Sequence, residues 1–165
     1  MGLIGISPII SPDLLVALAR MGHGDTICFA DANFPSETCL KAPGSPGPIT
    51  IRADGHEVTP LLRAVSKLFP LDSYTDCPVK MMAPVIGDEL DPSIEKRFEK
   101  AVEAEQPGMF KVERVERFDF YERARNCYAV VATGETAKYG NIILVKGVLG
   151  ASEESAEHGP AVFRL

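Results

Sequence analysis

The sequence lacks the signals of several large classes of protein. It has no run of about 18 apolar residues, the length that a membrane-spanning helix requires, and no basic segment at the N-terminus of the kind that opens a secretory signal. Its 17 Lys and Arg against 23 Asp and Glu give a formal net charge of −6, which excludes a general surface for phosphate backbones. We therefore expect a cytoplasmic protein that binds neither membranes nor nucleic acid.

Motifs for metals and cofactors are missing as well. The four cysteines, Cys28, Cys39, Cys77 and Cys127, lie far apart and form no CxxC pair, so neither a zinc site nor a redox motif is predicted. The chain contains no GxGxxG sequence, no Walker loop and no nucleophile elbow. We expect free thiols, no bound metal and no cofactor.

What the chain does contain is a regular alternation of helix and strand signals. In three places a capping residue is followed by proline, which is favoured at the first position of a helix. These helix starts are Ser11-Pro12, Thr59-Pro60 and Asp91-Pro92. Apolar residues at helical spacing follow each of them, and the first segment ends near Gly22, a residue suited to a left-handed cap. Three amphipathic helices are predicted.

Short apolar runs rich in Val and Ile alternate with these helices and predict strands. The runs cover residues 26–30, 49–52, 128–133 and 142–145, with a weaker candidate at 79–85. Because nearly continuous apolar runs are typical of strands covered on both faces, we predict a single α/β layered domain with a mostly parallel central sheet flanked by helices. This domain is expected to cover residues 1–149, and residues 150–165 are expected to form a C-terminal tail.

Polar residues gather at both ends of the first predicted strand. His23 lies between two glycines before the strand, and Asp31 follows directly after it. Loops at the carboxyl ends of parallel strands form the ligand crevice of α/β folds, which makes Asp31 a candidate ligand contact. An unperturbed histidine titrates at about pH 6.5 and can move protons at neutral pH. The alternative for His23 is a structural residue in a glycine turn, and the short His-Gly-Asp spacing slightly favours that alternative.

Two further polar clusters bracket another predicted strand. Arg117 and Tyr121 precede this strand, and Tyr139, Gly140 and Asn141 follow it. Arginine supplies hydrogen-bond donors in a fixed geometry, asparagine supplies a donor and an acceptor, and tyrosine supplies a hydroxyl with an apolar face. This mixture suits the binding of a small polyol.

Three other residues have competing interpretations. Asp72 follows the second predicted helix and either contacts a ligand or caps the next turn, and capping is the more common role. Phe118 and Phe120 fit the core of a helical turn better than they fit a binding site.

Several segments taken together resemble a known family. They are Ser11-Pro12-Asp13-Leu14-Leu15, Met21-Gly22-His23-Gly24-Asp25, Asp31-Ala32-Asn33-Phe34-Pro35, Ile51-Arg52-Ala53-Asp54-Gly55, Leu71-Asp72-Ser73-Tyr74, Phe120-Tyr121-Glu122-Arg123-Ala124, Thr133-Gly134-Glu135 and Tyr139-Gly140-Asn141. No single segment is specific, but the combination resembles the ribose pyranase and fucose mutarotase family from about residue 9 to residue 149. Two of the segments, those that contain Asn33 and Asn141, are similar to the fucose branch.

The resemblance implies a site assembled from these segments, with His23 as the proton donor. The implied substrate contacts are Asp31, Arg117, Tyr139, Gly140 and Asn141, and further positions near the sugar correspond to Asp72, Met82 and Tyr121. The resemblance also implies a homo-oligomer in which neighbouring subunits complete each pocket, without metal or cofactor.

The activity that the resemblance implies is the interconversion of the α and β anomers of L-fucose. The alternatives are pyranose–furanose interconversion of D-ribose, a non-catalytic monosaccharide sensor and, last, a scaffold protein. Exchange of anomers opens the sugar ring to the free aldehyde and closes it on the other face, so that one acid and one base suffice. His23 fits the acid, and the base is Tyr121, an aspartate such as Asp72, or an ordered water.

Overall fold

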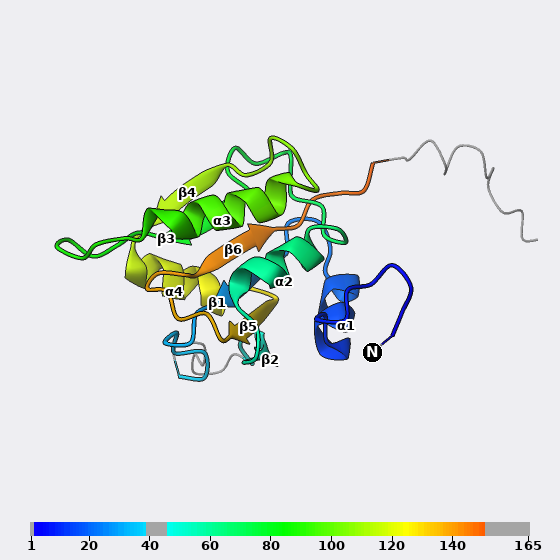
Figure 1. Ribbon diagram of the computed structural model, residues 1–165, viewed down its shortest axis with the longest axis horizontal. Helices are drawn as coiled ribbons and strands as arrows, with labels where there is room; N and C mark the ends of the chain where they lie inside the picture. Colours follow the sequence, from blue (N-terminus) through cyan, green and yellow to red (C-terminus); the bar gives the residue numbers. More distant parts are fainter. Residues whose placement is uncertain (1, 39–45, 151–165) are drawn as a thin grey trace, which may run out of the picture.

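A six-stranded sheet forms the centre of the computed structural model, which describes residues 2–38 and 46–150 (Figure 1). Its strands are β1 (Thr26–Ala30), β2 (Ile49–Ala53), β3 (Val79–Met82), β4 (Val112–Val115), β5 (Ala129–Thr133) and β6 (Ile142–Val145). They lie in the order β2-β5-β1-β6-β3-β4. Because β6 is antiparallel to both its neighbours and the other pairs are parallel, five strands point the same way. The mostly parallel sheet is as predicted.

Helices cover both faces of this sheet. They are α1 (Pro12–Arg20), α2 (Val58–Val65), α3 (Pro92–Glu103) and α4 (Arg117–Arg125). Side chains alternate between the faces along each strand: Phe29 of β1 packs in one core cluster with α1, α2 and α3, and its neighbour Cys28 packs in a second cluster with α4. The structure therefore confirms the predicted α/β layered architecture.

Two of the three predicted helix starts are found in the structure. The side chain of Ser11 caps α1 by accepting a hydrogen bond from the backbone N–H of Leu14, and that of Asp91 caps α3. The prediction for α2 was wrong, because this helix begins at Val58, which is fully buried and extends the apolar face toward the N-terminus. Thr59 consequently lies inside the helix, and its buried hydroxyl has no partner among the described residues.

The predicted left-handed cap at Gly22 was also wrong. The positive φ falls at Gly24 instead, at +83°, and the N–H of Gly22 donates to the carboxylate of Asp25. This hydrogen bond closes the turn that carries His23. The positive φ thus belongs to the turn after α1 and not to the helix end.

Strands β1 and β6 match their predicted limits, whereas β4 and α4 were not predicted as elements. In β4 the sequence is Val-Glu-Arg-Val, whose charged centre hides the strand signal. In α4 only Phe120 and Ala124 are buried, so the helix has almost no apolar stripe. Tertiary contacts with the sheet, more than local pattern, stabilise both elements.

The common direction of five strands gives the sheet two chemically different edges. We call the edge where those strands end the carboxyl edge, and the opposite one the amino edge. Asp31, Arg117 and Asn141 adjoin the carboxyl edge, where β1 and β4 end and β6 begins. His23 and Asp72 lie at the amino edge, before β1 and beside the end of β6.

Some predictions concern residues beyond the described ranges. Residues 151–165, nearly all of the predicted C-terminal tail, and Cys39 are among them, so the domain limits stay predictions. Cys28, Cys77 and Cys127 are free thiols. Within the described ranges, no helix has both the length and the apolar composition to cross a membrane.

Glu113 on β4 gives the fold a specific pH dependence. Its carboxylate accepts hydrogen bonds from Arg123 at 2.7 Å and Lys80 at 2.6 Å, which lower the pKa of Glu113 from 4.5 to about 2. Because the pKa in the folded state lies below its ordinary value, this stabilisation is present above about pH 4.5 and is lost as the pH falls toward 2.

We expect the substitution Glu113→Gln to lower the melting temperature by only about 1–3 °C at neutral pH, because its side chain is 39% exposed and water screens the two ion pairs. The difference from the wild type should shrink as the pH falls from about 6 to about 3. Thermal denaturation followed by circular dichroism measures the melting temperatures of the wild type and the variant at both pH values. A difference that is the same at both pH values would contradict this account of Glu113.

Candidate active site

A cavity of about 280 Å³ lies at the carboxyl edge of the sheet. The predicted site residues that line it are Asp31, Met82, Arg117, Tyr121, Tyr139 and Asn141. Gly140 lies between two of them in the chain. The structure therefore brings together most of the predicted substrate contacts, which come from four separate segments.

Asp31 and Asn141 form a buried pair in this cavity. The backbone N–H of Asp31 donates to Asn141 Oδ1 at 2.8 Å, and Asn141 Nδ2 donates to Asp31 Oδ2 at 2.6 Å. The other carboxylate oxygen, Oδ1, accepts from the N–H of Asn33 at 2.9 Å. Burial raises the pKa of Asp31, these hydrogen bonds partly offset the rise, and the charge of Glu135 adds to it. The carboxylate is fixed in direction, and with three hydrogen bonds on its two oxygens it retains a lone pair for a sugar hydroxyl.

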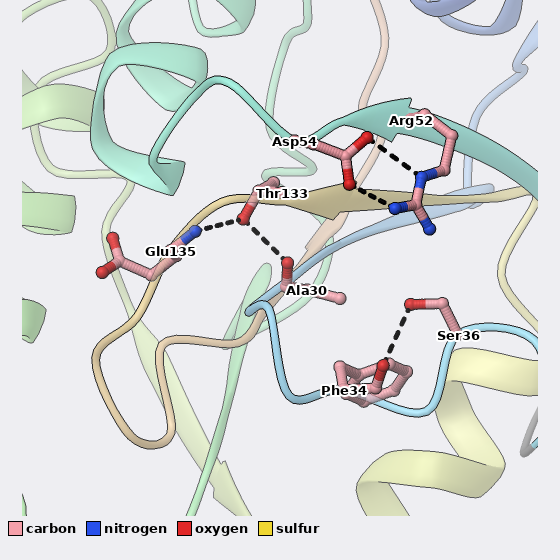
Figure 2. A network of polar contacts seen from close by, with 7 residues as sticks. All are labelled: Ala30, Phe34, Ser36, Arg52, Asp54, Thr133 and Glu135. Atoms are coloured by element: carbon pink, nitrogen blue, oxygen red, sulfur yellow. Dashed lines mark hydrogen bonds and ion pairs between the residues drawn. The ribbon is translucent and has the colours of Figure 1, made fainter.

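The ends of β1 and β5 are joined behind this pair by a short chain of hydrogen bonds (Figure 2). The hydroxyl of Thr133 donates to the carbonyl of Ala30 at 2.8 Å and accepts from the N–H of Glu135 at 3.2 Å. The carbonyl of Glu135 in turn accepts from the N–H of Ala32 at 2.8 Å. These bonds fix the backbone on both sides of Asp31.

Figure 2 also shows an ion pair between Arg52 on β2 and Asp54, which follows this strand, and the turn that carries Phe34 and Ser36. A second hollow lies between these groups and the end of β5. It is distinct from the cavity of about 280 Å³, with which it shares Asp31 and Phe34 as lining residues.

Gly140 is required by close packing against the buried side chain of Glu135. A Cβ atom at Gly140 would lie 2.8 Å from Glu135 Cγ and 3.0 Å from the carbonyl oxygen of Ala137. Glu135 Oε1 accepts from the N–H of Ala137 at 3.0 Å, and the side chain thus fills the inside of the loop that carries Asn141. The family resemblance implied a substrate contact at Gly140, but the packing that requires glycine there is visible only in the structure.

Arg117 supplies donors to the same cavity. It is the first residue of α4, and its buried Nε has no hydrogen-bond partner within the described part of the chain. The guanidinium lies 4.6 Å from the ring centroid of Phe118. Phe118 is 62% exposed, so its assignment to the core was wrong, whereas Phe120 is fully buried as predicted.

His23 and Asp72 form a pair at the amino edge. His23 Nε2 lies 3.1 Å from Asp72 Oδ1, and the same oxygen accepts from the backbone N–H of Tyr74 at 3.1 Å. Asp72 is therefore both a turn-capping residue and the partner of the histidine. The side chain of His23 is 48% exposed and that of Asp72 only 8%, so a buried carboxylate orients an accessible imidazole.

The length of β1 separates this pair from the cavity. At about 3.3 Å per residue, the five residues of β1 alone span roughly 17 Å. Two of the three predicted catalytic residues, His23 and Asp72, thus lie at the opposite edge of the subunit from the third, Tyr121. Within one chain the structure does not bring them together.

Two further residues that line the cavity, Asp88 and Lys138, were not predicted from the sequence. Asp88 lies in a loop with ordinary turn composition, and only its approach to Tyr139 in the folded chain places it at the cavity. Lys138 precedes a predicted contact and could have been found from that neighbourhood.

The fold and this arrangement can now be compared with known proteins. A model of the RbsD / FucU transport protein family matches residues 4–149. The chain belongs to this family. Among curated relatives, "L-fucose mutarotase" of Actinobacillus pleuropneumoniae serotype 5b (strain L20) is 51% identical over 144 residues, which are 87% of this chain and 95% of the relative.

Solved structures of RbsD/FucU proteins agree with the architecture. The fucose mutarotase from Streptococcus pneumoniae, solved in complex with L-fucose, is 43% identical, covers 90% of this chain and 100% of its own, and superposes with a TM-score of 0.81. Bacillus subtilis RbsD, complexed with D-ribose, is 23% identical over 91% of this chain and 100% of its own, with a TM-score of 0.67. The second likeness shows the fold alone. The family predicted from the sequence is thus confirmed.

Proposed function

We propose that this chain is an L-fucose mutarotase, an isomerase that interconverts the α and β anomers of the free sugar. The observation that carries the proposal is the cavity at the carboxyl edge, which the fixed acceptors of Asp31 and Asn141 line together with the donors of Arg117. The 51% identity to a curated L-fucose mutarotase over most of both chains supports the same substrate.

The cavity suits one monosaccharide. Acceptors and donors that are held by buried hydrogen bonds match the alternating hydroxyl groups of a sugar, and the side chains of Met82, Phe34 and Tyr121 supply apolar surface for its carbon face. A volume of about 280 Å³ is near the lower end of ligand cavities, which are about 300–1,000 Å³. A small sugar is therefore favoured over an oligosaccharide or a nucleotide.

In the proposed mechanism His23 supplies the proton that opens the ring. The carboxylate of Asp72 can only accept, so it keeps a proton on His23 Nε2 and directs Nδ1 outward. Protonated His23 donates from Nδ1 to the ring oxygen while a base removes the proton of the anomeric hydroxyl. The aldehyde group then rotates about one carbon–carbon bond. Proton transfers in the reverse direction close the ring on the other face of the aldehyde. Tyr121, which lines the cavity, is the proposed partner in the second transfer.

We further propose that His23 acts on the cavity of a neighbouring subunit. Its exposed ring at the amino edge supports this, because it lies at the far end of β1 from the cavity of its own chain. Apolar side chains beside the cavity are also exposed, with Ile86 at 103% and Phe118 at 62%. A second copy that covers them would place both halves of the site at one interface.

Saturation-transfer NMR on sugars at anomeric equilibrium tests the proposed activity directly. Irradiating the α-anomer proton of L-fucose should reduce the β-anomer signal in the presence of the protein. Transfer for D-ribose but not for L-fucose would favour the pyranase alternative. Binding of L-fucose without faster exchange would favour a sensor and contradict the proposed enzyme.

Prolonged treatment with a chelator should leave the exchange rate of L-fucose unchanged. The proposed proton transfers use only the side chains of the chain, and the described residues contain no cluster of three or more His, Cys, Asp or Glu that could hold a metal ion. The measurement compares exchange rates before and after dialysis against EDTA. Loss of activity that one added metal restores would contradict the mechanism.

A further inference from the structure

The loop between β3 and α3, residues 83–91, projects from the end of the sheet (Figure 1), and its residue Asp88 lines the cavity. One contact ties it to the loop that carries Asn141. The hydroxyl of Tyr139 donates to Asp88 Oδ2 at 2.6 Å and accepts from the backbone N–H of Val85 at 3.2 Å. Asp88 and Tyr139 both line the cavity. The tether therefore lies at the proposed sugar site.

The backbone conformation around both Asp88 and Tyr139 is unusual and places the two side chains in contact. Asp88 lies in a turn closed by its own N–H, which donates to the carbonyl of Val85 at 2.9 Å, and Gly87 in this turn has a φ of +93°. Tyr139 has a φ of +61°, the left-handed region that a side chain other than glycine rarely adopts. Such a backbone persists only where surrounding contacts enforce it, and it is concentrated at functional sites.

The two hydrogen bonds of Tyr139 determine what its hydroxyl can offer to a ligand. A tyrosine hydroxyl has one proton and two lone pairs. The proton is directed to Asp88, and one lone pair accepts from Val85. What remains is one lone pair, so Tyr139 meets a sugar as an acceptor of a hydroxyl proton and not as a donor.

We propose that Asp88 is a positioning residue for the sugar: it holds the hydroxyl of Tyr139 in this orientation and thereby selects a sugar hydroxyl that donates to it. The inference rests on the proposed function and deepens it. Lys138, whose Nζ lies 3.9 Å from Asp88 Oδ1, is the nearest cation and lies beyond hydrogen-bond distance. Asp88 therefore remains available as the acceptor for Tyr139.

A double-mutant cycle tests the role of Asp88. Asp88→Ala and Tyr139→Phe should each raise the KM for L-fucose by about fivefold to twentyfold, because a charge-assisted hydrogen bond that orders the binding site is lost. The kcat should stay within about threefold, because neither residue transfers a proton in the mechanism. Because Asp88 acts only through the hydroxyl of Tyr139, the KM of the double variant should be no higher than that of Tyr139→Phe alone. Asp88→Asn, whose amide oxygen still accepts from Tyr139, should recover most of the affinity.

Two controls make the cycle decisive. Glu89→Gln changes an exposed acid at the next position of the same loop and should leave the KM unchanged. Melting temperatures show whether each variant is folded. Multiplicative effects of Asp88→Ala and Tyr139→Phe, an unchanged KM in Asp88→Ala, or a fall in kcat alone would each overturn the role of Asp88.

The test also separates this inference from the proposed function. Failure of the wild type to exchange L-fucose anomers would sink the proposed function before any variant is measured. The same cycle can then be run on L-fucose dissociation constants from calorimetry, where independence of the two residues overturns the inference. If the wild type exchanges the anomers but the variants show no coupling, only the inference about Asp88 fails.

Discussion

Replacing His23 with alanine should slow the catalysed exchange of L-fucose anomers by about a hundredfold to ten-thousandfold, the range that a general acid typically supplies. His23 is the only residue in the proposed mechanism that protonates the ring oxygen, and its tautomer is set by Asp72 at 3.1 Å. The side chain is half exposed and its ring contact is with Tyr74, 77% exposed, so the fold should be retained. Saturation-transfer NMR measures the exchange rate, and thermal denaturation checks the fold.

His56 provides a matched control for this substitution. It is a half-buried histidine at the carboxyl edge whose backbone carbonyl accepts from the N–H of Gly134, an interaction that survives in His56→Ala. We expect His56→Ala to exchange anomers at the wild-type rate. Exchange by His23→Ala at a rate near that of the wild type would remove His23 from the mechanism, whatever the fate of the other site residues.

Local sequence signals correctly predicted the helices whose N-termini are capped by a neighbouring side chain. Ser11 and Asp91 cap α1 and α3 within three residues in sequence, so the sequence alone places both helix starts. The start of α2 and the whole of β4 depend on contacts with distant residues instead. Val58 begins α2 because the core buries it, and β4 exists because β3 pairs with it through all four of its residues. A single sequence carries little trace of such contacts.

The same distinction applies to the candidate site. Asp31 could be predicted because it directly follows a strand that the sequence marks clearly, and the sheet then places it at the carboxyl edge. Asp88 could not, since its hydrogen bond to Tyr139 spans 51 positions in sequence. The separation of His23 from the cavity follows from the length and direction of β1, and the predicted strand 26–30 between His23 and Asp31 already indicated it.

That separation has a consequence for any assembly of this chain. A subunit offers an imidazole at one edge and a sugar cavity at the other, so the proposed site needs two copies placed edge to edge. A monomer that binds sugar would then lack the acid. Substitutions at the two edges should therefore damage different halves of the same site, and each half can be supplied by a different subunit.

Mixing two inactive variants should for this reason restore activity. His23→Ala keeps an intact cavity and Arg117→Ala keeps an intact His23–Asp72 pair, so a site between one subunit of each kind has both halves. With random assembly of equal amounts, about one quarter of the sites combine an intact cavity with an intact histidine, since each half is intact in half of the subunits. The exchange rate should rise from near the background to about a quarter of the wild-type rate, measured after the variants are unfolded and refolded together.

The matched control mixes two variants of the cavity half, Arg117→Ala and Asp31→Asn. Every site then has a damaged cavity, and no recovery is expected although the subunits exchange equally well. Mass spectrometry of the intact oligomers, with one variant labelled with ¹⁵N, verifies that mixed assemblies have formed. If mixed oligomers of His23→Ala and Arg117→Ala form but stay inactive, His23 does not act on a neighbouring cavity. His23 would then have to act on the cavity of its own chain. The span of roughly 17 Å along β1, which separates the two, argues against this.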